Sequence, residues 1–153
     1  MKRETDHLSK LNDRYEYPDF NWDVVEPSNQ EIQWLNNAFK VSRLHEKSGG
    51  RYNMAAIVAK GGRIRSVGKN FYRKSGKAKR EDYDVLSIHA ELHAILQTEG
   101  NLKGHTIYIA GHSNNRNMAN TQPCRFCMQT IKDAGIKKIV FCDEDKPVKI
   151  ILR

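Results

Sequence analysis

The glycine pair Gly61-Gly62 constrains the fold of this chain more than any other feature, because it stands between two strand-like runs. Residues 54–60, MAAIVAK, are almost continuously apolar, and residues 63–70, RIRSVGKN, are more mixed. Two glycines between such runs are typical of a tight β-hairpin. The two runs are therefore predicted to pair as antiparallel strands.

Helix patterns occur on both sides of this hairpin. Ser28 and Glu31 have the spacing of a capping box, and the helix that they begin is predicted to stop at Gly49-Gly50. Pro123 and Gly135 mark the start and the end of a later helix. The predicted elements after the hairpin are helices over residues 88–96 and 123–134 and strands over residues 105–110 and 138–142.

This order of elements predicts an α/β protein in which helices pack on a mixed sheet. The turn at residues 143–147 is too short for a parallel crossover, so the last run, VKIILR, either returns antiparallel or is an irregular tail. Residues 1–29 are polar and show no helical or strand period. They are expected to form an N-terminal extension of a single domain, residues 30–153.

The composition narrows the class of protein. With 153 residues, of which 39% are hydrophobic and 29% charged, the chain suits one globular domain. No apolar run approaches the roughly 18–20 residues that cross a bilayer, so no membrane partner is expected. Three cysteines, an odd number, do not suit the disulfide framework of a secreted domain, and a cytoplasmic location is predicted. The net charge of +8 favours anionic partners such as nucleotides or nucleic acid.

Two short motifs stand at the starts of the last two predicted helices. One is His89-x-Glu91, and the other is the C-x-x-C of Cys124 and Cys127. Alone, His-x-Glu is common on helices, and C-x-x-C serves as a redox pair, as half of a zinc finger or as two buried thiols. Together the motifs supply one nitrogen and two sulfur ligands. This is a set that suits catalytic zinc, which keeps its fourth position open.

Glu91 is the candidate general base and acid beside the three candidate metal ligands. The two cysteines, three residues apart, share one helix face and can bind one ion, and His89 can complete the set. Glu91 lies two residues beyond that histidine, where it can reach a metal-bound water as a general base and acid. Zinc lowers the pKa of such a water from about 15.7 to about 7.

With these motifs the chain resembles the cytidine/deoxycytidylate deaminase superfamily, whose signature is H-x-E followed by P-C-x-x-C. The signature stands here as His89-Ala90-Glu91 and Pro123-Cys124-Arg125-Phe126-Cys127. The resemblance implies a three-layer fold with a mixed central sheet of about five strands. It also implies one catalytic Zn²⁺ per chain, held by His89, Cys124 and Cys127, with Glu91 as the proton shuttle. The implied reaction is hydrolytic deamination of a cytosine nucleotide, most simply dCMP to dUMP with release of ammonia.

The same resemblance gives candidate substrate contacts. In the family, the hairpin before the first motif ends in an asparagine that contacts the sugar, and Asn70 matches that place. The alternative is an asparagine that simply ends a strand. The backbone amide of Ala90 and the pair Ala55 and Ala56 are expected to line the base pocket.

Several departures from the family pattern weaken the assignment of the substrate. Gln122 stands where many relatives have glutamate, and His93 stands where nucleotide deaminases often have asparagine. The chain after Cys142 is too short for the extra helix of relatives that have a parallel fifth strand. That side of the pocket is therefore expected to be built differently or to be completed by a neighbouring subunit, and the resemblance implies a homo-oligomer.

A basic loop, residues 73–80, is a candidate phosphate clamp, and its alternative is a solvated loop. The candidate phosphate contacts are Arg73, Lys74, Arg116 and Arg125. One or two such residues suit a mononucleotide. A deaminase of tRNA or single-stranded DNA would also stack bases on aromatic side chains such as Phe71, Tyr72 and Phe126. The mononucleotide is favoured, because no long basic stripe interleaved with aromatic residues occurs outside this loop.

A third hypothesis is a non-catalytic scaffold stabilised by zinc. Structural zinc sites are normally closed by four protein ligands, so Glu91 beside an open position argues against it. The remaining cysteine, Cys142, is expected to be buried without a role.

Overall fold

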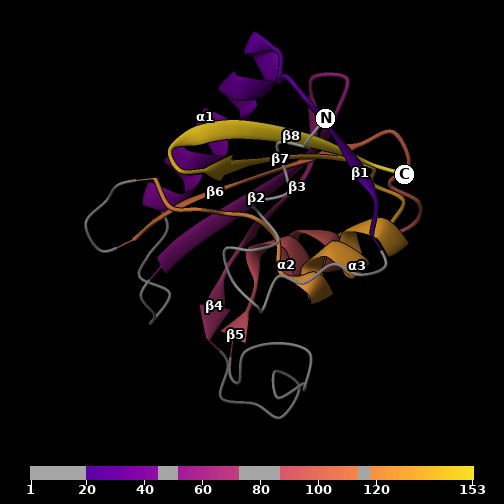
Figure 1. Ribbon diagram of the computed structural model, residues 1–153. Helices are drawn as coiled ribbons and strands as arrows, with labels where there is room; N and C mark the ends of the chain where they lie inside the picture. The colour runs from indigo at the N-terminus through magenta and orange to yellow at the C-terminus, as the bar shows by residue number, and fades with distance from the viewer. Residues whose placement is uncertain (1–19, 45–51, 73–86, 114–117) are drawn as a thin grey trace.

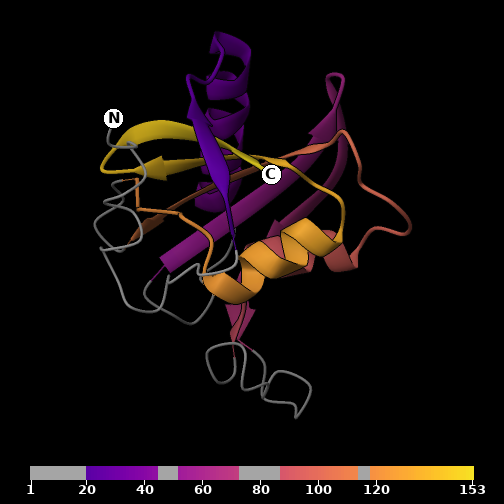
Figure 2. The same cartoon turned by 45° about the vertical axis from the view of Figure 1, so that its right-hand side comes forward.

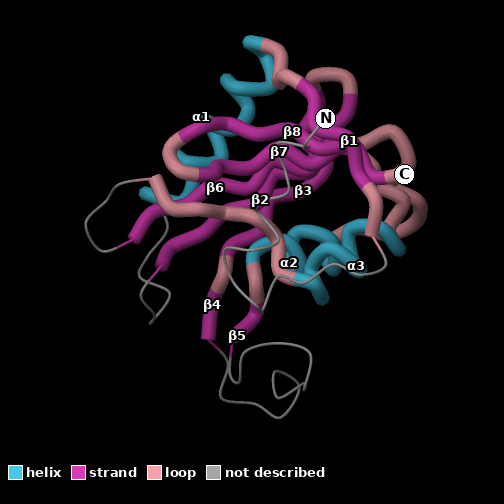
Figure 3. The backbone as a smooth tube through the Cα atoms, viewed as in Figure 1, coloured by secondary structure: helices cyan, strands magenta, loops and turns pink. Residues whose placement is uncertain are grey.

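The computed structural model describes residues 20–44, 52–72, 87–113 and 118–153, and there the chain forms one main sheet between two layers of helices (Figure 1). α1 (Asn29–Leu44) covers one face of the sheet, while α2 (Ala90–Leu96) and α3 (Arg125–Asp133) lie together on the other face. The turned view in Figure 2 and the tube in Figure 3 show the same three layers. This is the three-layer α/β architecture that the sequence predicts.

The main sheet has six strands in the order β1-β8-β7-β6-β2-β3. β6 and β7 are parallel, and all other neighbouring pairs are antiparallel, so the sheet is mixed as predicted. A separate antiparallel pair, β4 with β5, projects below the main sheet in Figure 1. The strands are β1 (Trp22–Val25), β2 (Tyr52–Lys60), β3 (Arg63–Lys69), β4 (Phe71–Tyr72), β5 (Ser87–Ile88), β6 (Thr106–Ser113), β7 (Lys138–Asp143) and β8 (Lys146–Leu152).

Two tight turns set the antiparallel register. Gly61 and Gly62 join β2 to β3 with φ angles of 58° and 80°, in the left-handed region that glycine adopts easily, so the predicted hairpin is confirmed. Glu144 and Asp145 join β7 to β8 with φ angles of 51° and 63°. The last run of the chain therefore returns antiparallel, which is the first of the two outcomes expected for it.

α1 begins with the capping box that the sequence predicts. Ser28 Oγ accepts a hydrogen bond from the Glu31 N–H at 3.1 Å, and Glu31 Oε1 accepts one from the Ser28 N–H at 2.9 Å. Glu31 also forms an ion pair of 2.7 Å with Lys149 of β8. These contacts tie the start of α1 to the sheet. The predicted stop at Gly49-Gly50 lies outside the described residues.

Alternation along β2 divides the core into two apolar clusters. Ile57 and Ala59 pack against Leu35 of α1, on one face of the sheet. Ala56 and Val58 point to the opposite face and join the cluster that lies beneath α2 and α3. Helices on both faces of the sheet thus pack against β2, which lies between β6 and the edge strand β3. No helix in the described ranges is long and apolar enough to cross a bilayer.

The strand β1 differs from the expectation that residues 1–29 lack strand structure. It pairs with β8 through Trp22 opposite Leu152 and Val24 opposite Ile150, and it forms one edge of the sheet. Trp22 and Val24 turn toward the cluster beneath α2 and α3. A strand of four residues is too short to show a clear alternation of apolar and polar residues in the sequence. Its partner strand lies at the other end of the chain. For this reason the sheet has six strands instead of about five.

Candidate metal centre

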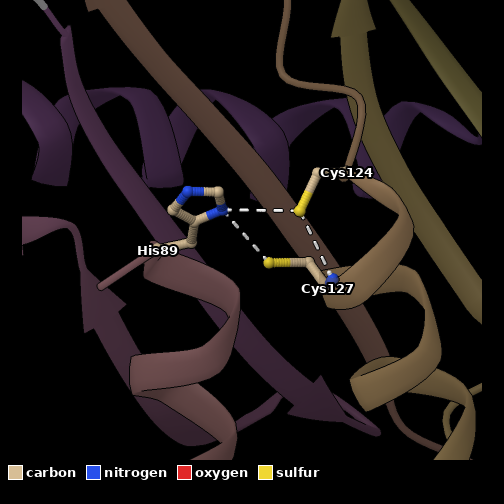
Figure 4. A group of neighbouring side chains, drawn as sticks. All are labelled: His89, Cys124 and Cys127. Atoms are coloured by element: carbon tan, nitrogen blue, oxygen red, sulfur yellow. Dashed lines mark hydrogen bonds between the residues drawn. The ribbon is translucent and has the colours of Figure 1, made fainter. Parts of the chain in front are cut away.

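The two motifs begin two neighbouring helices. His89 is the N-cap residue of α2, with extended backbone (φ −75°, ψ 151°), and Cys124 is the N-cap residue of α3. The third helix therefore begins one residue after Cys124, with Pro123 just before the cap, slightly later than the sequence predicts. Gly135, with a φ of 94°, follows its last turn as predicted. Because α2 and α3 pack side by side, their starts bring the two motifs together (Figure 4).

The first turn of α3 presents both sulfur atoms to the same side. Cys124 Sγ accepts a hydrogen bond from the Cys127 N–H at 3.4 Å, which caps the helix with the side chain of a ligand candidate. Cys127 is fully buried, and Cys124 is 8% exposed. The thiol pair is thus held by the backbone of one helical turn.

His89 completes a compact group of three donor atoms. Its Nδ1 lies 3.6 Å from Cys124 Sγ and 3.3 Å from Cys127 Sγ, and the three atoms all lie within 4.8 Å of one another. In a tetrahedral zinc site, bond lengths of about 2.3 Å to sulfur and about 2.0–2.1 Å to nitrogen place such atoms about 3.6 Å apart. The observed nitrogen–sulfur distances match this requirement, so the three residues suit a Zn²⁺ ion.

The two thiols differ in acidity. Hydrogen bonds with Cys127 and with His89 lower the pKa of Cys124 to about 4, in spite of its burial. Burial raises the pKa of Cys127 well above its ordinary value, and the neighbouring charge of Cys124 adds to this. The pair therefore supplies one thiolate readily, and a cation between the sulfur atoms favours loss of the second proton.

Glu91 is a buried carboxyl group beside this pair. It is 6% exposed and stands at the second position of α2. Burial raises its pKa above the ordinary value, while the charge of His89 and a hydrogen bond with Cys127 act in the opposite direction. A raised pKa makes the carboxylate a stronger base, which suits a group that takes up a proton and passes it on as a general base and acid.

The structure separates the two alanines predicted to line the base pocket. Ala56 and Ala90 belong to the cluster on the α2 side of the sheet, the same side as the metal centre. Ala55 pairs with Ala110, which packs under α1 on the opposite face. Strand alternation therefore turns the Ala55 side chain away from the centre, and of the pair only Ala56 has its side chain on the same face as the centre.

Asn70 follows the last residue of β3 and is tied to β2. Its Oδ1 accepts a hydrogen bond from the Met54 N–H at 2.8 Å, and its own N–H donates to Met54 O at 3.3 Å. Next to it, the Lys69 N–H donates to His93 Nδ1 at 3.0 Å, which links this turn to α2. The sequence marks His93 only as a departure from the family pattern and gives no indication of this linking contact.

The candidate phosphate contacts fall on different parts of the chain. Arg125 is the first residue of α3, is exposed, and places its guanidinium 4.7 Å from the ring centre of Phe126. Arg73, Lys74 and Arg116 lie outside the described residues. Cys142 is fully buried in β7, as expected.

Comparison with known proteins agrees with this geometry. The family model of the cytidine and deoxycytidylate deaminase zinc-binding region matches residues 28–143. The dCMP deaminase from the cyanophage S-TIM5, solved in complex with dCMP and dUMP, is similar with 22% identity and a TM-score of 0.51, over 75% of this chain and 82% of that chain. The cytidine deaminase from Burkholderia pseudomallei is similar with 20% identity and a TM-score of 0.53, over 77% of this chain and 89% of that chain. No curated protein sequence matches the chain. At such identities the structural likeness establishes the fold.

Proposed function

Because this chain belongs to the cytidine and deoxycytidylate deaminase family, a family of zinc-dependent hydrolases that act on C–N bonds, we propose that it converts dCMP to dUMP with release of ammonia. The observation that carries the proposal is the group of His89 and two cysteines, with the buried Glu91 beside it. Three donors and an adjacent carboxyl suit a hydrolytic centre, whereas a structural zinc site normally has four protein ligands.

In this proposal His89 Nδ1 and the sulfur atoms of Cys124 and Cys127 hold one Zn²⁺ ion. Helix starts fix all three residues, so little rearrangement is needed when the ion binds. When bound, the ion supplies activation of a water molecule at neutral pH. The protein supplies the remaining steps through proton transfer and positioning.

Glu91 moves the protons of the reaction. Its carboxylate takes one proton from the attacking water and gives it to N3 of the cytosine ring, while the water oxygen bonds to C4. It then passes the second proton of that water to the amino nitrogen on C4. The C4–N bond breaks, ammonia leaves and the C4 carbonyl of uracil forms, so that atoms and charge balance.

Residues around the metal centre are proposed to position the substrate. We expect Ala56 and the backbone of Ala90 to face the base, and Asn70 to contact the sugar. The bond from Met54 holds the Asn70 side chain in place, so the amide is oriented before a substrate binds. Arg125, at the start of α3, is the described candidate for the phosphate. Each of these contacts is a proposal that single substitutions can test.

A mononucleotide is proposed as the substrate for two reasons. The similar cyanophage enzyme was solved with dCMP and dUMP. In addition, Arg125 is exposed next to the ligand candidate Cys124, where a single phosphate could be contacted. We also propose a homo-oligomer, an assembly that the resemblance to this family implies. Sedimentation velocity of the purified protein tests this part.

The test of the proposed function is ammonia release from a panel of substrates. The panel contains cytidine, deoxycytidine, their monophosphates, a short single-stranded DNA and a tRNA anticodon stem. We expect dCMP to give the highest kcat/KM. Turnover of the DNA or the tRNA alone, with a steep dependence on salt, would instead establish the nucleic-acid deaminase. Bound zinc without ammonia from any substrate would establish the scaffold.

Glu91→Ala tests the proton shuttle directly. We expect kcat to fall by about 10²- to 10⁴-fold while one zinc per chain is retained. Glu99→Ala is the matched control, because Glu99 is exposed beyond the end of α2 and contributes nothing to the centre. Full activity of Glu91→Ala would rule out the proposed role.

A further inference from the structure

The strands β6 and β7 separate next to the metal centre. Their parallel pairing ends at Ile109 opposite Phe141, although β6 continues to Ser113 and β7 to Asp143. Residues 118–121 occupy the space between them. Ala119 N–H donates to Gly111 O at 2.8 Å, and Met118 forms a bridge with His112. The chain that leads to α3 is therefore inserted into the sheet as a short additional segment.

Thr121 connects this segment to both strands. Its hydroxyl donates to Ile109 O of β6 at 2.7 Å and accepts from the Cys142 N–H of β7 at 2.9 Å. Its own N–H donates to Cys142 O at 2.9 Å. The residue is only 4% exposed. Its hydroxyl thus satisfies a backbone acceptor of β6 and a backbone donor of β7 that strand separation would leave unpaired, and a buried unpaired group is destabilising.

A short and stiff link joins Thr121 to the metal centre. Only Gln122 and Pro123 separate it from Cys124, and Pro123 is buried with a φ fixed by its ring. Cys124 lies 3.6 Å from His89 Nδ1, a distance that depends on where α3 begins. A displacement of residue 121 would therefore also displace Cys124 Sγ.

We propose that Thr121 is a positioning residue for the metal centre: its hydroxyl locks the segment before α3 between β6 and β7 and so sets Cys124 opposite His89. This inference rests on the metal ligands proposed above and adds a residue outside the ligand set. It does not require that the substrate be dCMP. Groups that orient metal ligands through hydrogen bonds typically affect metal affinity by about 10- to 100-fold, and we take this range for Thr121, which acts through Gln122 and Pro123.

The test compares three variants by zinc affinity, measured by competition with a chromogenic chelator. Thr121→Val keeps the shape of the side chain and removes the hydroxyl, and we expect a Kd for zinc raised by about 10- to 100-fold. Thr121→Ser keeps the hydroxyl and should bind zinc as the wild type does. Thr106→Val is the matched control, because Thr106 is also a buried threonine. It lies at the start of β6, away from the end of β6 that residues 118–121 contact. This variant should retain zinc affinity.

A spectrum with Co²⁺ in place of zinc supplies a second measurement. We expect Thr121→Val to change the visible bands of a tetrahedral site and Thr106→Val to leave them unchanged. If Thr121→Val does not fold, Thr121→Ala, which leaves room for water at the two backbone groups, takes its place with the same expectations.

Wild-type zinc affinity and a native cobalt spectrum in the valine or alanine variant would overturn the inference, as would an equal loss in Thr106→Val. A wild-type protein that binds no zinc, or that binds it equally well as Cys124→Ser, would instead refute the proposed ligands. The two failures are therefore distinguishable.

Discussion

Gly68 of β3 is the position where one added methyl group should damage the site most. A Cβ there would meet Ala90 O and Ala94 N of α2 at 2.3 Å. Both contacts are with helix backbone, which cannot rotate away as a side chain does. The φ angle of Gly68 is not in the left-handed region, so Gly68→Ala tests space alone.

The size of the effect follows from these distances. Ordinary contact begins at 3.4 Å, so β3 and α2 must separate by about 1.1 Å to admit the methyl group. Overpacking of this kind costs about 1–3 kcal/mol of unfolding free energy. The start of α2 carries His89 and Glu91, and a displacement of about 1 Å at a reacting group can lower the rate about 10²-fold. We therefore expect a fall in kcat of about that size at saturating zinc.

The assay measures kcat for dCMP, zinc content and the urea denaturation midpoint in the same preparations. Val67→Ile is the control, because Val67 is on the same strand but packs with the cluster under α1. It should lose stability by overpacking and keep kcat. A Gly68→Ala protein with wild-type kcat and zinc content would refute the idea that this close contact sets the position of α2.

Further predictions concern single side chains. Asn70→Ala removes the acceptor of the Met54 N–H, so it should lower the unfolding free energy in chemical denaturation by about 1–3 kcal/mol and raise KM. Asn70→Asp keeps an acceptor, so it should raise KM with a smaller loss of stability. Burial raises the pKa of Glu31, but hydrogen bonds from Lys149 and Ser28 outweigh this and hold it below 4.5. The stabilisation from this carboxylate is therefore complete above pH 4.5 and is lost as the pH falls through the lowered pKa. The unfolding free energy of Glu31→Gln should be about 1 kcal/mol lower than that of the wild type at pH 7 and equal to it in strong acid. A constant difference at all pH values would contradict the assignment. Cys124→Ser should lose zinc and activity together, as measured by metal analysis and ammonia release, and added zinc should restore neither at stoichiometric amounts.

The elements that were predictable are those with strong local determinants. The capping box of Ser28 and Glu31 and the glycine turn at Gly61-Gly62 each depend on residues close in sequence, and both are confirmed. The motifs around His89 and Cys124 were recognisable because H-x-E and P-C-x-x-C are short local patterns, and the three-residue spacing of the two cysteines places both on one side of a helix start.

Long-range pairing accounts for what was missed. β1 exists because β8 offers it an edge, and nothing in the four residues Trp22–Val25 specifies a partner so distant in the chain. The orientation of Ala55 depends on the register of β2 with β6. Thr121 resembles an ordinary loop residue until the separation of β6 and β7 gives its hydroxyl two backbone partners.

X-ray absorption at the zinc edge of the purified protein tests the central claim most directly. The account predicts one zinc per chain, with two sulfur neighbours at about 2.3 Å and nitrogen or oxygen neighbours at about 2.0–2.1 Å, one of them an imidazole that is lost in His89→Ala. Four sulfur neighbours, a shell without sulfur, or a folded protein that binds no zinc would contradict it.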